Sequence, residues 1–263
     1  MSAGRDLKIL TYKISIFMLS ILFFISFPLH AQEKEKLLVL EVYPQWYSEN
    51  DFTIQGNIGT EKELEHNNWF ESYLSPSMTY ALDHNWALHG GLGVHYKYYD
   101  DSDNRWEVRP FVGVSHYYPW TEKWKTSSYF RVEERYFKYL GDEASSNNTR
   151  MRFRLRSDYI FNPLSLANTW HRFTMSIEGL KSEESDLSIQ EPDLYAYETR
   201  VTLGMERSLE KQEKIRFELS LISRNRPSES SASSVQIIYF KLKYYPLWGL
   251  PVRNKLFQRN IEE

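Results

Sequence analysis

The sequence predicts an all-β protein, a transmembrane antiparallel up-and-down β-barrel of about ten strands. Most of the chain after residue 36 alternates polar with apolar side chains, as strands with two different faces do. Aromatic residues make up 16% of the chain, although its mean hydropathy is only −0.57. A barrel strand needs apolar side chains only at alternate positions, whereas a membrane helix needs a long apolar run, and none follows residue 31. A hydrophilic average and a high aromatic content are therefore compatible in a barrel.

The first 31 residues have the layout of an export signal. Three basic residues precede an apolar run over residues 14–29, and Leu29-His30-Ala31 offers a cleavage site in which leucine replaces the usual small residue. Because the run is shorter than the ~20 residues of a spanning helix, a removed signal is favoured over an uncleaved anchor. We therefore expect a signal peptide at 1–31, a barrel in the bacterial outer membrane at 32–245 and a periplasmic tail at 246–263.

The charge and the cysteine content exclude several classes of protein. Residues 1–31 hold three basic residues and one acidic residue, so the 32 basic and 35 acidic residues of the chain become 29 and 34, a formal charge of −5. A nucleic-acid-binding domain is expected to be basic, so no nucleic-acid partner is predicted. The chain has no cysteine, which excludes disulfides, a thiol nucleophile and a thiolate metal site.

Five alternating segments are predicted as strands in the first part of the chain. In the clearest, Trp86 and Leu92 share one face and His89 lies on the other; farther on, Phe130 alternates with Arg131. These segments span residues 52–60, 69–82, 86–99, 105–118 and 124–140.

Five more segments follow the same rule. Phe173 and Met175 flank Thr174 on the opposite face, and the last two segments alternate less cleanly, with Arg216 and Lys241 on their polar sides. The segments span residues 149–160, 170–180, 194–208, 214–225 and 234–245.

Residues 36–47 leave the strand count open. They read as an eleventh strand, yet single-chain bacterial barrels normally have an even number. The segment could continue into the first strand, could lie outside the wall, or could indicate that another strand is missing from the count. Ten strands are predicted, with twelve as the alternative.

Connectors of two lengths predict the orientation. Those at 83–85, 119–123 and 209–213 are short, whereas most of the others are longer and polar. Short turns at the periplasmic end and long loops outside the cell are typical of outer-membrane barrels. The longer connectors span residues 61–68, 141–148, 181–193 and 226–234.

Tryptophans lie close to the ends of the predicted strands. An indole ring at a strand end can lie in the interface between lipid and water, where its polar N–H stays hydrated. An interfacial aromatic girdle is predicted from Trp69, Trp86, Trp106, Trp120, Trp124 and Trp170.

The segment from Arg150 to Asp158 has the strongest charge pattern in the chain. Arginines occupy its even positions up to 156, while Met151, Phe153 and Leu155 face the other way. Acidic residues on other strands turn this arginine face inward, because a buried charge needs a partner. Glu133 and Glu178 are predicted among its partners, and charge reversal at Arg154 is expected to lower barrel stability.

The predicted charge network fills the lumen, either as structural packing or as a narrow polar conduit that favours anions. Its predicted members are Glu107, Arg109, Arg131, Glu133, Arg135, Arg152, Arg154, Arg156, Asp158, Arg172, Glu178, Glu198, Arg200, Glu206, Arg216 and Glu218.

Catalysis and metal binding have weaker support in the sequence. His89 and His95 share a face, but six residues of strand separate them by roughly 20 Å, too far for one metal. Ser115 and His116 are adjacent and so point to opposite faces, which prevents a hydrogen-bonded nucleophile and base. A serine paired with a histidine from another strand stays possible. No catalytic residue, metal or cofactor is predicted.

Three motifs resemble an uncharacterised family of Gram-negative, notably Bacteroidetes, outer-membrane barrels, the domain of unknown function 2490. They are Glu107-Val-Arg-Pro-Phe-Val-Gly-Val114, Phe130-Arg-Val-Glu-Glu-Arg-Tyr136 and Arg150-Met-Arg-Phe-Arg-Leu-Arg156. The resemblance covers about residues 44–246 and implies an outer-membrane location without an activity.

We expect a monomeric barrel of structural or narrow-transport type. Its expected partners are outer-membrane lipid and, during biogenesis, the barrel-assembly machinery. A lipid-modifying or hydrolytic barrel enzyme and a soluble, lipocalin-like periplasmic ligand binder are the alternatives.

Overall fold

A computed structural model describes the chain from residue 33 to residue 246 with several gaps. The predicted signal peptide, Trp120 and the tail after residue 246 lie outside the described residues. The described ranges are 33–47, 51–65, 69–100, 103–119, 121, 123–141, 145–161, 169–182, 197–209, 213–225 and 234–246.

The regular structure of the described residues consists of β-strands. None of these residues forms a helix that is long and apolar enough to cross a membrane. The strands are β1 (Glu33–Val42), β2 (Gln45–Tyr47), β3 (Phe52–Gln55), β4 (Ile58–Glu63), β5 (Trp69–Leu74), β6 (Ser77–Ala81), β7 (Trp86–Tyr99), β8 (Arg105–Pro119), β9 (Trp124–Tyr139), β10 (Ser145–Ile160), β11 (Trp170–Ser182), β12 (Tyr197–Ser208), β13 (Lys214–Asn225) and β14 (Ser234–Tyr245).

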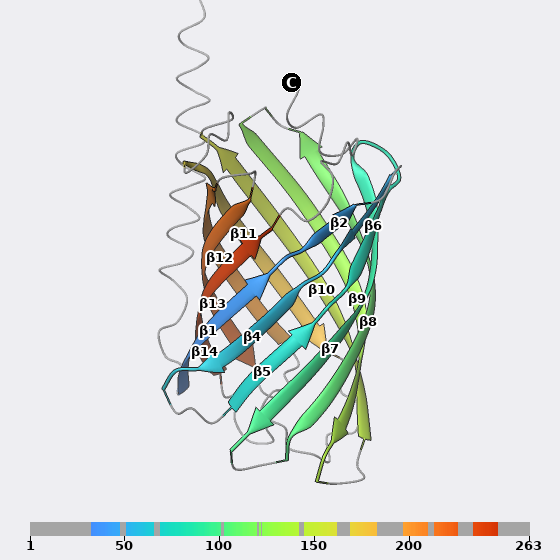
Figure 1. The fold of residues 1–263 in the computed structure, drawn as a ribbon, viewed down its shortest axis with the longest axis vertical. Coiled ribbons are helices and arrows are strands. Elements are labelled where there is room, and N and C mark those ends of the chain that lie inside the picture. The colour runs from blue at the N-terminus through green and yellow to red at the C-terminus, as the bar shows by residue number, and fades with distance from the viewer. Residues whose placement is uncertain are drawn as a thin grey trace, which may run out of the picture. The chain divides into compact units, whose positions relative to one another are not determined.

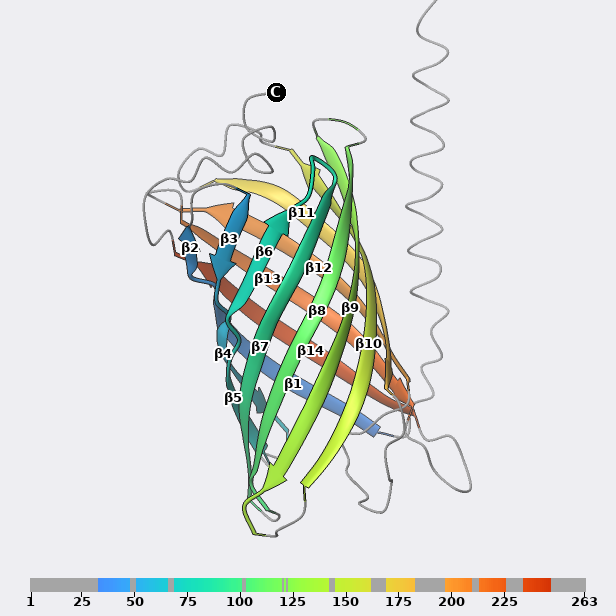
Figure 2. The same ribbon diagram turned by 90° about the vertical axis from the view of Figure 1, so that its right-hand side faces the viewer.

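The strands close into a barrel (Figures 1 and 2). Within the described ranges, the closed ring of pairings contains eleven strands: β1, β4, β5 and β7 to β14. Neighbours in the ring are antiparallel except β1 and β14, which pair in parallel with Leu37 opposite Tyr239. The predicted counts of ten and twelve were therefore wrong. The first strand occupies its own place in the wall, and an odd number of strands makes the closing pair parallel.

Three predicted strands near the N-terminus are each divided by a short break. β1 and β2 flank Pro44, β3 and β4 flank Gly56, and β5 and β6 flank Pro76. Backbone hydrogen bonds show that the breaks lie side by side. The Gly56 N–H donates to the Pro44 carbonyl at 2.8 Å, and Asn57 and Ser75 exchange two backbone hydrogen bonds. Proline has no N–H for a strand ladder, which explains why the pairing stops there.

The connectors contrast in length less sharply than predicted. β4 extends to Glu63 and β10 begins at Ser145, so both strands take up residues that had been assigned to loops. The longest connector, 183–196, still joins strand ends opposite the turn at 82–85, but the next longest, 161–169, joins strand ends on the same side as that turn.

The polarity of the barrel wall is the reverse of that of a soluble protein. Large apolar side chains point outward along the wall, with Phe153 53% and Val112 65% exposed. The buried side chains of the described residues include more polar and charged groups than hydrophobic ones. Soluble monomers rarely expose apolar surface of this extent.

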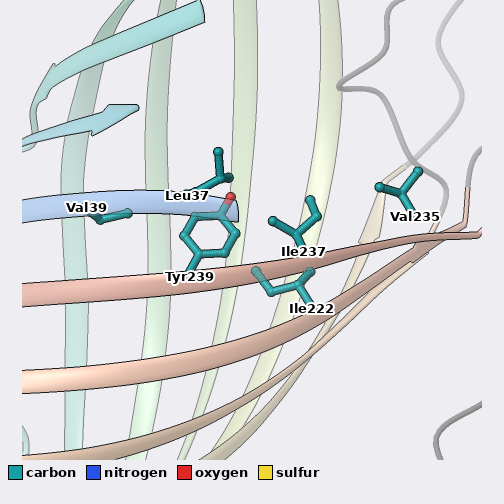
Figure 3. Close-up of a cluster of buried hydrophobic side chains, with 6 residues drawn as sticks. All are labelled: Leu37, Val39, Ile222, Val235, Ile237 and Tyr239. Carbon is teal, nitrogen blue, oxygen red and sulfur yellow. The ribbon is translucent and has the colours of Figure 1, made fainter. Parts of the chain in front are cut away.

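One apolar group nevertheless lies on the inner face. Six buried side chains from β1, β13 and β14 pack together (Figure 3). Trp69 packs against them. We call this group the apolar cluster, and it lies at the parallel seam between the first and last strands. Its members are Leu37, Val39, Ile222, Val235, Ile237 and Tyr239.

Candidate functional site

The candidate site is the charged inner face of β8 to β13. Alternation along each strand places one set of side chains inside the barrel: on β10, Arg150 is buried, whereas Met151 and Leu155 are each 41% exposed. All sixteen residues predicted for the charge network are buried or half-buried. All except Arg154 form ion pairs within 4 Å.

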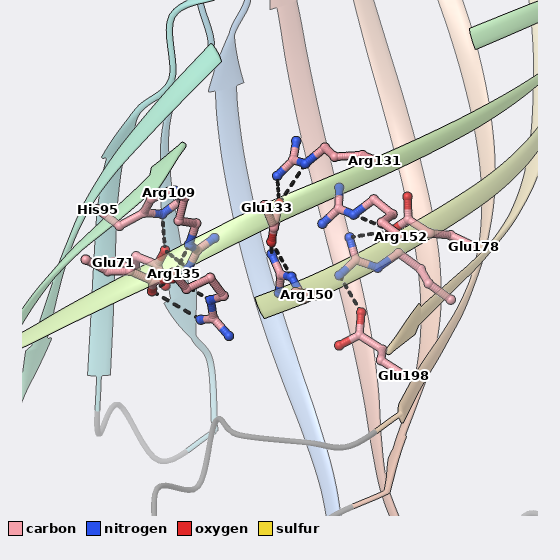
Figure 4. A network of polar contacts seen from close by, with 12 residues as sticks. Glu71, His95, Arg109, Arg131, Glu133, Arg135, Arg150, Arg152, Glu178 and Glu198 are labelled. Carbon is pink, nitrogen blue, oxygen red and sulfur yellow. Dashed lines mark hydrogen bonds and ion pairs between the residues drawn. The ribbon is translucent and has the colours of Figure 1, made fainter. Parts of the chain in front are cut away.

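Glu133 on β9 lies between two arginines (Figure 4). Its carboxylate accepts a hydrogen bond from Arg131 Nε at 2.6 Å on one side and pairs with Arg150 on the other. Arg150 lies directly opposite Glu133 in the β9–β10 register. Glu133 is only 1% exposed, so the two guanidinium groups supply the compensation that its buried charge requires.

A second group connects β5, β7, β8 and β9. Glu107 accepts hydrogen bonds from Arg109 at 2.7 Å and from Arg135 at 3.1 Å. Arg109 also lies 3.7 Å from Glu71, which makes a 2.6 Å hydrogen bond with His95 Nδ1. Glu71 and His95 were not among the predicted site residues, although both lie on the polar face of alternating segments.

A third group connects β10, β11, β12 and β13. Glu198 accepts hydrogen bonds from Arg200 at 2.8 Å and from Arg224 at 2.7 Å. Glu178 is held more loosely, with Arg152 Nε at 3.8 Å and Arg200 at 3.9 Å. Glu178 and Glu133, the acids expected beside the arginine face of β10, thus lie against Arg152 and Arg150.

Several ion pairs also lie near the barrel end that holds the turn at 82–85. Glu206 pairs with Arg216, with His171 at 2.9 Å and with Arg172 at 3.8 Å, and Asp158 pairs with Arg156 at 2.9 Å. Glu218 pairs with Lys243 at 2.9 Å and with Arg216 at 3.6 Å.

A further group reaches the first strand, which the predicted network did not include. Lys243 lies 3.5 Å from Glu41, and Glu41 accepts a 2.6 Å hydrogen bond from the Tyr73 hydroxyl. Glu41 was missed because the segment 36–47 had no assigned place in the wall. Its alternation, with Leu38 and Leu40 outward and Glu41 inward, was the available signal.

Most of these carboxylates bridge residues on different strands. Removing one partner of a buried ion pair leaves an uncompensated charge and costs about 3–5 kcal/mol, whereas the intact pair adds little net stability. The network therefore holds neighbouring strands in one register. The described residues contain no cluster of three or more His, Asp or Glu side chains that could hold a metal.

Arg154 differs from the other network members. In the described part of the chain it forms no ion pair, and its guanidinium lies over the Tyr129 ring, 5.2 Å from the ring centroid. Tyr129 and Glu178 lie opposite Arg154 on the two neighbouring strands.

Four of the predicted girdle tryptophans lie at strand ends with outward side chains. Trp86, Trp106, Trp124 and Trp170 are 39–44% exposed. Trp69 was assigned to the girdle wrongly, since it lies against the apolar cluster and its ring stacks on the Lys97 ammonium at 3.8 Å. Alternation along β5 directs Phe70 outward and Trp69 inward. The position of Trp69 at a strand end did not determine the direction of its side chain.

Ser115 and His116 point to opposite faces. His116 packs outside against the Trp86 ring, whereas Ser115 is buried inside. A histidine from the neighbouring strand approaches the serine instead: His89 Nε2 lies 2.8 Å from Ser115 Oγ. His89 Nδ1 lies 3.0 Å from the Thr79 hydroxyl, so a hydrogen-bonded row crosses β6, β7 and β8.

Comparison with known proteins gives a family and a structural neighbour. Residues 40–232 match the model of a family described as "Protein of unknown function (DUF2490)". No curated protein matches the chain. Among solved structures, a chain described as "NanC porin structure in rhombohedral crystal form" has 12% sequence identity and a TM-score of 0.41, covering 73% of this chain and 92% of that one.

Proposed function

Since this chain belongs to the DUF2490 family of proteins of unknown function, we propose its function from the geometry of its barrel. We infer that it is an integral outer-membrane β-barrel with an ion-paired interior. Its role is structural or that of a narrow conduit for polar or anionic solutes. The mature chain begins after a removed signal peptide, functions as a monomer and contacts lipid through its outer face.

The inverted polarity of the wall carries this proposal. Apolar side chains cover the outside, with Leu88 44% and Phe217 48% exposed, while carboxylates such as Glu198 are buried inside. An apolar outer surface on a closed barrel requires an apolar solvent, which lipid supplies. The outward tryptophans at strand ends, such as Trp86 and Trp106, are suited to the interfaces on either side.

Fractionation of cells that express the full-length chain tests the location. The protein is expected in the outer-membrane fraction, and its gel mobility should change on heating, because a folded barrel migrates differently from the unfolded chain. Recovery from the soluble periplasm without detergent would reject the proposal and favour a lipocalin-like ligand binder.

Planar-bilayer recordings separate the two roles. A conduit is expected to give small single-channel steps with a reversal potential that indicates anion preference, because arginines line the interior. A folded protein that gives no steps in either polarity would assign the structural role.

One observation favours a hydrolytic enzyme as a second candidate. With the proton on Nδ1, His89 donates to Thr79 and accepts from the Ser115 hydroxyl, the arrangement in which a histidine activates a serine nucleophile. A fluorophosphonate probe should then label the purified protein, and Ser115→Ala should abolish the labelling.

Ser220→Ala is the matched control for that experiment. Ser220 is also buried inside the barrel, but its hydroxyl bonds Thr202 at 2.7 Å rather than a histidine. Absence of labelling in the wild type, or labelling that survives Ser115→Ala, would eliminate the enzyme.

A further inference from the structure

Three arginines on β9 and β10 have less carboxylate around them than their charge requires. Arg131 and Arg152 lie directly opposite each other in the strand register, and Arg154 follows on the same face. We call these three residues the arginine triplet. Like charges directly opposite on paired strands repel, so the arrangement is unfavourable without a counter-charge.

The nearby carboxylates are shared with other arginines. Glu133, which pairs with Arg131, also pairs with Arg150. Glu178 lies 3.8 Å from Arg152 Nε and also 3.9 Å from Arg200. Because Glu133 and Glu178 each also pair with an arginine outside the triplet, the triplet keeps an excess of positive charge.

The triplet contains one donor without a hydrogen bond and one guanidinium without an ion pair. The Nε atom of Arg152 is buried and has no hydrogen-bond partner among the described residues; Glu178 Oε1, 3.8 Å away, also makes no hydrogen bond there. Arg154 forms no ion pair in that part of the chain, and its guanidinium lies over the face of the Tyr129 ring. A buried guanidinium donor without an acceptor is costly, which favours a binding partner supplied from solution.

Glu178 lies opposite Arg154 on β11, yet among the described residues no carboxylate lies within 4 Å of the Arg154 guanidinium. Its neighbour Tyr129 contacts the edge of His89, with ring centroids 5.2 Å apart, and His89 bonds Ser115 and Thr79. Gly113 leaves room for Tyr129, since a Cβ there would lie 3.1 Å from the tyrosine hydroxyl. The Tyr129 ring supplies no counter-charge to Arg154, so an anion could supply one.

We propose that the arginine triplet binds a small oxyanion, the carboxylate, phosphate or sulfate group of a solute, between Arg152 and Arg154. The planar guanidinium group donates two parallel hydrogen bonds to two oxygens of such a group, and the pairing is stronger in a poorly hydrated interior. This inference rests on the proposed function, because the solute must enter the polar interior of the barrel.

Anion-dependent stability of the purified full-length protein tests the site. The midpoint temperature of the mobility change is measured in detergent with sodium phosphate, sulfate or acetate replacing chloride at constant ionic strength and pH. Low millimolar concentrations limit the general stabilisation by sulfate and phosphate. A bound anion raises the midpoint, and above its Kd the rise grows with the logarithm of the anion concentration, because the anion binds only the folded state.

Arg154→Gln is the informative variant, since Arg154 can be replaced without depriving a carboxylate of an ion pair. Arg156→Gln is its matched control, on the same strand and face but paired with Asp158. The rise in midpoint should be abolished in Arg154→Gln and kept in Arg156→Gln. An equal rise in wild type and Arg154→Gln, or no rise with any of the three anions, would overturn the site.

Failure of the anion site and failure of the proposed conduit give different results. A protein that shows the Arg154-dependent rise but conducts no ions keeps the binding site and loses the conduit. A protein that conducts anions, yet has the same selectivity and the same anion-dependent rise in Arg154→Gln, keeps the conduit and loses this site.

Discussion

The interior of the barrel contains two regions of opposite chemistry that are buried to the same degree. Ile237 in the apolar cluster and Glu133 in the charge network are each 1% exposed. The apolar cluster gains stability from the removal of hydrocarbon from water, which does not depend on direction. The network has to satisfy each charge with a partner in a fixed place. Burial inside the barrel therefore does not require an apolar side chain, but a charged one requires a specific neighbour.

The two regions also differ in what they specify. A shift of one residue between β9 and β10 would turn Arg150 away from Glu133 and direct the inner arginines toward the outer surface. The network thus fixes the register of the antiparallel strands. The apolar cluster lies where β1 meets β14 in parallel, and there it fills the seam.

Charge reversal in the network should have the largest effect on stability. Arg150→Glu would place two buried carboxylates opposite each other and remove a partner of Glu133. We expect the free energy of unfolding to fall by at least about 3–5 kcal/mol, enough to prevent folding in a marginal protein. Urea titration of the mobility change in detergent measures it.

Lys123→Glu is the control for that variant. Lys123 is exposed in the connector before β9, so its reversal should change the free energy of unfolding by less than about 1 kcal/mol. Similar losses in the two variants would show that burial of the network does not control stability.

Truncation in the apolar cluster should have the next largest effect. Ile237→Ala would leave a cavity between β1, β13 and β14 and lower the free energy of unfolding by about 2–4 kcal/mol. Ile238→Ala, one residue along, removes the same atoms from the opposite face of β14 and should cost less. Equal losses would indicate that the cluster is loosely packed, and the comparison between the two regions would fail.

Alternation was sufficient to predict the barrel and the inner face of β8 to β13, because a period of two residues determines the face of each side chain. It could not predict closure. Nothing within residues 33–47 indicates that Leu37 lies opposite Tyr239, some two hundred positions away, in a parallel pair. The strand count was missed for that reason.

Ion pairs inside the barrel were predictable only between strands that follow each other in the sequence. Arg150 with Glu133 follows from one hairpin, whereas Glu41 with Lys243 joins the two ends of the chain across the seam. Trp69 was misplaced because proximity to a strand end does not determine direction, which alternation along β5 does.

Charge reversal at Arg154 should have the smallest effect on stability. The sequence alone predicted a loss there, but Arg154 forms no ion pair among the described residues, whereas Arg150 pairs with a buried carboxylate. Arg154→Glu deprives no carboxylate of an ion pair, but it places a second carboxylate opposite Glu178 on β11. We therefore expect the free energy of unfolding to fall by about 1 kcal/mol, less than in Arg150→Glu. A loss as large as that of Arg150→Glu would mean that Arg154 is compensated in the folded barrel, and the distinction between the arginine triplet and the rest of the network would be lost.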